Sequence, residues 1–405
     1  MTCGVQEKNH WPVLAELGGL FFLHGMAMGA WFVPLGTVLD AHGMQSIKPF
    51  AFACSAVAAF VSPLIFGAMA DRHVAPVRVL RWLAMATAGL VALVAVALQQ
   101  GASAWLVLAL IQIQALCSAP TWGLTNSIVF GRLSNSQRQF GPVRALATLG
   151  WMSGCWLVSA LHADTSTVAC FISVTVWLAV AAYSLWMPAI VPATSSERLT
   201  IRQRLGLDAL TLLRERDHRV VLLTVALFAI PLAAFYPFTP THLRQLGLER
   251  TSAWMTLGQV TEIIAMLALP GLLARWRLKW ILGAGLGFGV LRYALCSLNG
   301  EGWVLAGVTL HGFAFTLVFI TVQIYLDQRI DPAWRTRAQA LYTVMLSGVG
   351  NFIGYLGTGA WFRFTAHDGA VNWSLFWGGL SVAVGLVGAY FLTAYRGRGP
   401  GPQRM

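Results

Sequence analysis

Two charged side chains, Arg144 and Glu262, lie inside stretches of sequence that otherwise consist mainly of apolar residues. A charged group in the hydrocarbon region of a membrane costs at least about 2.5–3.5 kcal/mol. Such groups are retained where they face the interior of a helix bundle or a watery path and act on a solute or an ion. The two residues therefore predict a polar site within the membrane, with one charge from each half of the chain.

Helical spacing places further side chains beside Arg144. Thr148 and Trp151 follow it at steps of four and three residues, so all three lie on one face of a helix. A cation, a hydroxyl and an indole on one face can pair, hydrogen-bond and stack with a polar solute that contains a ring. The alternative is that Arg144 is close enough to the helix end to reach the lipid headgroups.

The second half of the chain offers a similar set. Gln259 and Glu262 are three residues apart on one face, and His311 and Phe315 are one turn apart in a later apolar stretch. A histidine that faces a cavity can bind a ligand or carry a proton, whereas a histidine that packs in a helix does neither. Arg292 is a further charge in an apolar stretch, and it either pairs with Glu262 or serves the packing.

The composition indicates the elements that must position these residues. The chain has 405 residues, of which 57% are hydrophobic and only 10% charged, against about 25% charged residues in a soluble domain. The apolar stretches recur along the whole chain, each near the ~20 residues that cross a bilayer. We predict an all-α membrane protein with twelve transmembrane helices in two six-helix bundles. The predicted bundles span residues 1–190 and 219–405, and a basic, weakly amphipathic cytoplasmic linker spans 191–218.

Charge and motif content narrow the function classes. The net charge of +12 is concentrated in alternate loops, which is the positive-inside pattern of a bacterial-type inner membrane protein with both termini in the cytoplasm. The charge therefore sets topology and does not predict nucleic-acid binding. The chain carries no HExxH, no convincing Ser/His/Asp arrangement, no phosphate-binding glycine loop and no CxxC pair among its 6 cysteines. We expect no catalytic activity, metal or cofactor.

A short motif follows the second apolar stretch. Gly67 lies four residues before Asp71, and Arg72 and Arg78 follow. This pattern resembles the loop motif of the major facilitator superfamily, in which the acid and the basic residues hold the cytoplasmic ends of neighbouring helices together. The resemblance predicts that these four residues form a cytoplasmic latch. The alternative is ordinary flanking charge.

Several stretches, taken in order, resemble the nucleoside:proton symporter family of that superfamily. They are residues 118–128, 142–151, 205–210, 259–262, 291–295, 311–315 and 337–340. The resemblance implies proton-coupled nucleoside symport by alternating access, and a nucleoside site lined by Arg144, Thr148, Trp151, Gln259, Glu262, His311 and Phe315.

The seventh apolar stretch departs from the family pattern. It offers Ala233 and Tyr236 where the family site has amides, and Thr316 stands where an acid often follows the aromatic residue of the tenth stretch. Tyr236 is therefore included in the predicted site. Glu262 and His311 are the candidates for proton coupling.

The expected partners are a small solute, with a nucleoside favoured, protons and the lipid bilayer, and we expect a monomer. Three alternatives remain open. They are the same fold carrying a sugar, an aromatic acid or a drug-like compound, a membrane-embedded enzyme, and a sensor that does not transport. All transport interpretations require a pocket at mid-membrane depth, walled by both bundles.

Overall fold

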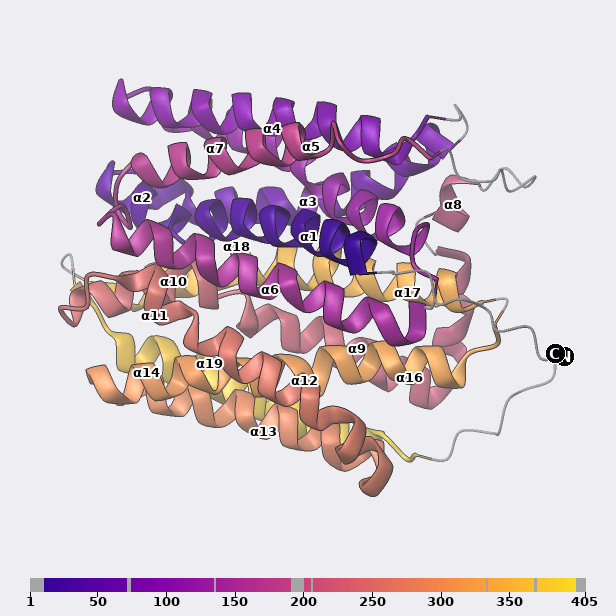
Figure 1. The fold of residues 1–405 in the computed structure, drawn as a ribbon. Coiled ribbons are helices and arrows are strands. Elements are labelled where there is room, and N and C mark those ends of the chain that lie inside the picture. The colour runs from indigo at the N-terminus through magenta and orange to yellow at the C-terminus, as the bar shows by residue number, and fades with distance from the viewer. Residues whose placement is uncertain are drawn as a thin grey trace, which may run out of the picture.

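The computed structural model describes residues 11–70, 74–134, 136–190, 200–204, 207–332, 334–367 and 370–397. Almost all of these residues are helical. Most of the earlier helices, drawn in indigo to magenta, lie above most of the later ones, drawn in orange and yellow (Figure 1). We call residues 11–190 the first half and residues 207–397 the second half.

The first half begins with a helix pair that is broken near Pro34. This proline follows Phe32, the last residue of the first helix, and the next helix starts at Leu35. A proline lacks the N–H that a continuous helix needs, so the first apolar stretch is divided into two helices. The helices of this half are α1 (Trp11–Phe32), α2 (Leu35–Ala41), η1 (Gln45–Ile47), α3 (Lys48–Ala70), α4 (Pro76–Gln99), α5 (Ala104–Phe130), α6 (Ser136–Ala160) and α7 (Val168–Tyr183).

The described residues of the predicted linker include two short helical segments. They are α8 (Ile201–Arg204) and η2 (Leu207–Arg214). Arg337 of the second half forms an ion pair of 3.2 Å with Asp208 in η2. The linker therefore contacts the body of the second half as well as joining the two halves.

The second half repeats the pattern of interrupted helices. One interruption follows Pro231, where α9 ends and α10 begins shortly afterwards, and two others are π-helical segments, which are frequent at functional sites. The elements are α9 (Arg216–Leu232), α10 (Phe235–Gln245), α11 (Thr251–Met255), α12 (Leu257–Arg275), α13 (Leu278–Ser297), α14 (Glu301–Thr309), α15 (His311–Phe315), η3 (Thr316–Ile320), α16 (Thr321–Arg329), α17 (Arg335–Thr343), η4 (Val344–Gly350), α18 (Asn351–Thr365), β1 (Ala366–His367), β2 (Ala370–Val371) and α19 (Trp373–Ala394). The two strands pair antiparallel, with Ala366 opposite Val371.

The outer surface is apolar, as a lipid-facing surface must be. Leu267 is 79% exposed, and tryptophans such as Trp186, at 77%, are exposed near helix ends, where a membrane protein carries its interfacial aromatic residues. Nine helices among the described residues are long and apolar enough to cross a membrane, and two shorter apolar helices accompany them. The chain is a polytopic membrane protein.

Close packing of α1 on α6 fixes the position of the first-half site residues. A Cβ at Gly150 of α6 would collide with the backbone oxygen of Phe22 in α1. Glycine here lets the two backbones touch. Because Arg144 and Trp151 lie on the same helix as Gly150, this contact sets how far both residues reach toward the second half.

Candidate functional site

Arg144 of α6 lies against two aromatic rings of the first half. Its guanidinium carbon is 4.3 Å from the centre of the Trp122 ring in α5 and 5.7 Å from that of Phe21 in α1. The side chain is half-buried, and a cation over an aromatic face is stabilised by the ring quadrupole. The arginine is therefore held against aromatic rings of α1 and α5.

Glu262 of α12 is the opposite charge across the two halves. The charges of Arg144 and Glu262 act on each other electrostatically, yet no direct ion pair joins them among the described residues. On the Glu262 side, a Cβ at Gly312 would collide with the backbone nitrogen of Glu262, so α12 and α15 are in backbone contact. The two charges therefore approach each other from opposite halves.

Aromatic side chains from both halves lie between the helices that carry these charges. The Tyr236 ring of α10 is 6.0 Å from Trp151 and 5.2 Å from Phe32. Gln259 Nε2 donates a hydrogen bond of 3.3 Å to the Tyr236 hydroxyl. The buried Nε1 of Trp151 has no hydrogen-bond partner among the described residues, so this cluster holds a donor that a solute could satisfy.

His311 and Arg292 form a separate unit within the second half. Arg292 is 1% exposed, its guanidinium lies 4.6 Å from the rings of Phe235 and Tyr293, and its Nη1 donates to Nδ1 of His311 at 2.5 Å. His311 also stacks on Phe235, at 3.8 Å between ring centres. Since an arginine can only donate, His311 Nδ1 is an acceptor and any ring proton sits on Nε2. Arg292 therefore binds His311 and packs against aromatic rings. This arrangement supports the interpretation that Arg292 serves the packing over the interpretation that it pairs with Glu262.

The remaining predicted residues, Phe315 and Thr148, lie on the same helices as the residues above. Phe315 ends α15, with its ring 6.0 Å from His311 and 5.2 Å from Phe319. Thr148 is half-buried on α6, between Arg144 and Trp151. The helix spacing that grouped these side chains is preserved, since Phe315 and His311 share one turn.

Sequence reasoning missed His24 of α1. This buried residue contacts Thr121 Oγ1 through Nε2 at 2.9 Å and Thr125 Oγ1 through Nδ1 at 3.1 Å. Its ring centre is 4.9 Å from that of Trp122, the ring that holds Arg144. A polar residue in the middle of the first apolar stretch was the available signal. His24 fixes the Trp122 ring and α5, and so acts indirectly on the arginine.

A cavity of about 190 Å³ adjoins this cluster. Its lining residues come from α1, α2, α3 and α5 alone, which are all in the first half. They include Trp122 and Phe32. The expectation of a pocket walled by both halves stays a prediction, because this cavity lies in one of them.

The predicted cytoplasmic latch is only partly within the described part of the chain. Asp71 and Arg72 lie outside the described residues. Gly67 lies in α3, and Arg78 is an exposed residue in the first turn of α4. The latch therefore stays a prediction.

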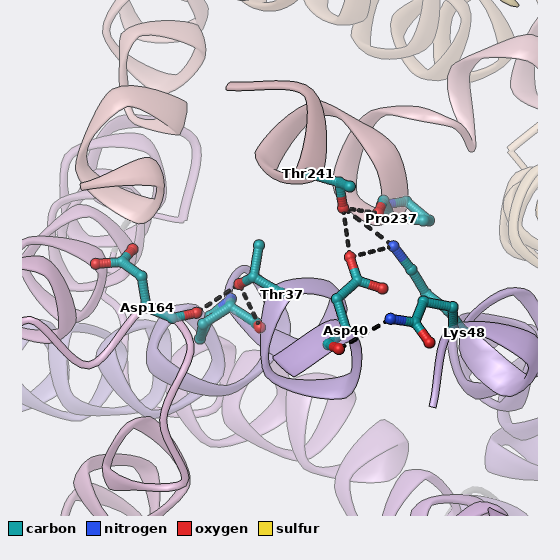
Figure 2. Close-up of polar contacts among 8 residues, drawn as sticks. Thr37, Asp40, Lys48, Asp164, Pro237 and Thr241 are labelled. Carbon is teal, nitrogen blue, oxygen red and sulfur yellow. Dashed lines mark hydrogen bonds and ion pairs between the residues drawn. The ribbon is translucent and has the colours of Figure 1, made fainter. Parts of the chain in front are cut away.

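The two halves are joined at the end of the bundle where α2 and α10 meet. Asp40 of α2 and Lys48 of α3 form an ion pair of 2.6 Å. Thr241 of α10 donates to Asp40 Oδ2 at 2.7 Å and accepts from Lys48 Nζ at 3.0 Å. Figure 2 shows this network, in which the first half supplies the charges and the second half a hydroxyl. Lys48 is 1% exposed.

A second junction at the same end centres on Asp164, which follows α6. Its Oδ1 accepts from Ser159 Oγ at 3.0 Å and, across the halves, from the backbone nitrogen of Ser252 at 2.6 Å. Its backbone oxygen accepts from Thr37 Oγ1 (Figure 2). Trp156 Nε1 donates to Thr256 Oγ1 at 3.0 Å nearby. The two junctions hold this end closed, and neither was part of the sequence-based site.

A helical bundle with an apolar outer surface, interacting charges from its two halves and polar contacts that join the halves at one end has the architecture of a membrane transporter. Solved structures agree on the fold. A crystal structure of a single-residue mutant of the nucleoside transporter NupG superposes with a TM-score of 0.87 at 21% identity, covering 95% of this chain and 100% of that one. A bacterial homologue of the human lysosomal transporter Spinster, in an inward-facing conformation, superposes at 0.67 with 14% identity, covering 98% of this chain and 100% of that one.

The sequence comparisons define the family. The model of the family described as nucleoside H+ symporter matches residues 13–398, and the chain belongs to that family. A relative from Escherichia coli (strain K12), named "Putative nucleoside transporter YegT", is 31% identical over 94% of this chain and 93% of its own length. Xanthosine permease of the same organism is 25% identical over 90% of this chain and 91% of its own length. The chain is a transporter and not an enzyme, and the resemblance identified from its sequence is confirmed.

Proposed function

We propose that this protein carries nucleosides across the bacterial inner membrane together with protons, by alternating access. The observation that supports this proposal is the electrostatic interaction between Arg144 and Glu262, which come from opposite halves, together with the contact between the aromatic rings of Trp151 and Tyr236 across the same halves. A solute held there contacts both halves at once. The names of the relatives, which include a xanthosine permease and a nucleoside transporter, favour a nucleoside as the solute.

Each side chain has a role in this proposal. Arg144, Thr148, Gln259 and Glu262 offer charges and hydrogen bonds to ribose and base, and Trp151, Tyr236 and Phe315 offer faces or edges for stacking. His311, fixed by Arg292, shapes the second-half wall.

Glu262 is the preferred proton carrier. Its carboxyl can lose its charge by taking up a proton when the site closes off from water. His311 is the less suitable of the two candidates, because a proton on its Nδ1 would break the hydrogen bond from Arg292.

The alternating motion follows from the closed end. The Asp40–Lys48–Thr241 network and the Asp164 junction hold one end shut, and rocking of the halves would break them while the opposite end closes. We propose that the halves are two six-helix domains, residues 1–190 and 219–405 with the linker 191–218, giving twelve spans. The arginine-rich loops support cytoplasmic termini, so the closed end faces the periplasm. We propose a monomer with no nucleic-acid partner.

Proteoliposomes with the full chain test this function. Counterflow of uridine, adenosine and xanthosine, with a hexose and empty vesicles as comparisons, tests the solute. Glu262→Gln is expected to keep counterflow, which needs no net proton movement, and to lose accumulation driven by a pH gradient. Glu301→Gln, at an exposed position, is the matched control. If Glu262→Gln still accumulates solute with unchanged pH dependence, Glu262 does not couple transport to protons. If the hexose shows faster counterflow than any nucleoside, the proposal that the solute is a nucleoside is wrong.

A further inference from the structure

An open groove of about 630 Å³ lies where α12 meets α13, and its walls are basic and aromatic. The residues that line it are Arg275, Trp276, Arg277, Trp280 and Ala284. Arg275 ends α12, and α13 begins at Leu278. Both helices are long and apolar enough to cross a membrane. Because so short a connection joins two spanning helices, the groove lies at the level of the lipid headgroups.

The two arginines are not used by the rest of the protein. Both side chains are exposed, and neither has an ion-pair or hydrogen-bond partner among the described residues. No acidic residue lines the groove, and the first turn of α13 has neither an acid nor a side-chain cap. A guanidinium binds a phosphate through two parallel hydrogen bonds, and the start of a helix favours an anion. The groove therefore offers an anion two cations and a favourable helix end.

The other walls change from aromatic to apolar along α13. Trp276 and Trp280 are 53% and 58% exposed, and an indole is favoured where one side is apolar and the other is wet. Ala284 lies one turn beyond Trp280 and packs against the apolar cluster that contains Leu269 and Ile281. Cations, then indoles, then an apolar wall match the order of the phosphate, the glycerol esters and the acyl chains in a phospholipid.

The charge of the groove selects among lipids. Arginines and tryptophans at a membrane surface usually set topology one by one, whereas here they line one groove whose volume is within the range of ligand sites, about 300–1,000 Å³. A zwitterionic lipid would bring its own cation beside two arginines, and an anionic lipid would not. A free phosphate would leave the indoles and the apolar wall without a partner.

We propose that the groove at the α12–α13 connection binds an anionic phospholipid, with its phosphate between Arg275 and Arg277 and its acyl chains along α13 past Ala284. Lys279 Nζ donates to the backbone oxygen of Tyr395 at 3.2 Å. The site therefore lies at the end of the molecule that carries the last described residues, which the proposed topology places in the cytoplasm. It is separate from the central site and does not depend on which solute is carried.

Native mass spectrometry of the full chain in detergent, with phosphatidylglycerol and phosphatidylcholine as probes, tests this site. The unmodified protein is expected to retain phosphatidylglycerol in preference to phosphatidylcholine. Arg275→Gln combined with Arg277→Gln should lower the affinity for phosphatidylglycerol roughly thirtyfold, because each basic residue near anionic lipid contributes about fivefold. Arg202→Gln combined with Arg214→Gln is the matched control, since it removes the same charge from two exposed linker arginines that do not line the groove.

A second variant separates a built site from a general attraction of charges. Ala284→Leu keeps both arginines and fills the apolar end of the groove, so it should also weaken phosphatidylglycerol binding, with a thermal-shift assay used to verify folding. Unchanged binding in Ala284→Leu or in the Arg275/Arg277 pair overturns the site, as do equal losses in the two arginine pairs. Equal retention of the two lipids, or displacement of the lipid by inorganic phosphate, also overturns it. Failure of the unmodified chain to carry nucleosides would overturn the proposed function and leave this site standing.

Discussion

The Asp40–Lys48–Thr241 network allows the closed conformation to be weakened by one nearly isosteric change, Thr241→Val. In the structure the Thr241 hydroxyl donates to Asp40 and accepts from Lys48, and it is the second-half member of the network. Valine keeps the shape of threonine and removes both bonds. Because Asp40 and Lys48 remain paired at 2.6 Å, neither charge is left alone.

The magnitude follows from the charged partners. Hydrogen bonds to charged groups contribute about 1.5–3 kcal/mol each, and the surviving ion pair limits the total loss to about that range. Since about 1.4 kcal/mol corresponds to a factor of ten, the ratio of open to closed molecules at this end should rise about ten- to 150-fold. The perturbation acts on conformation and leaves the residues of the central site in place.

Distances between spin labels measure this ratio directly. Ser46 and Glu249 are exposed, lie in different halves and flank the closed end, so cysteines there report separation of the halves by double electron–electron resonance in nanodiscs. Thr175→Val is the matched control, because Thr175 is exposed on α7 and its hydroxyl donates to the backbone oxygen of Phe171. A distance distribution in Thr241→Val identical to that of the unmodified chain, or an equal shift in Thr175→Val, would refute the reasoning.

Two further predictions concern the packing that supports the site. Gly150→Ala should lower both thermal stability and uptake, because the added Cβ collides with α1. Gly271→Ala is the control and should change neither, since a Cβ there meets nothing within 4 Å. Equal effects of the two substitutions in a thermal-shift assay would contradict this prediction. Arg292→Lys keeps the charge but loses the planar group that lies against two rings and donates to His311, so stability should fall by about 1–3 kcal/mol. Arg214→Lys at an exposed position is its control, and an unchanged melting curve in Arg292→Lys would show that the stacking contributes little.

Much of the fold class could be predicted from the sequence, because the cost of placing charges in a membrane and the length of a spanning helix act locally. The apolar stretches, the sparse charges at Arg144 and Glu262, and the shared helix faces around them all follow from those two facts. The order of short similar segments along the chain indicated the family, which the family model over residues 13–398 confirms.

Only the tertiary structure decided which partner each polar group finds. From its position in the sequence, Arg292 could pair with Glu262 or serve the packing. The packing of α13 against α15 places it in a hydrogen bond with His311 instead. Thr241 joins Asp40 across 201 residues, and Gln114 faces a cavity only because α1, α3 and α5 leave space between them. Periodicity fixes which side chains share a face, whereas the rotation and crossing of helices distant in sequence depend on the packing of every contact between them. For this reason the charged residues of the site could be read from the chain, and the closed end and the cavity could not.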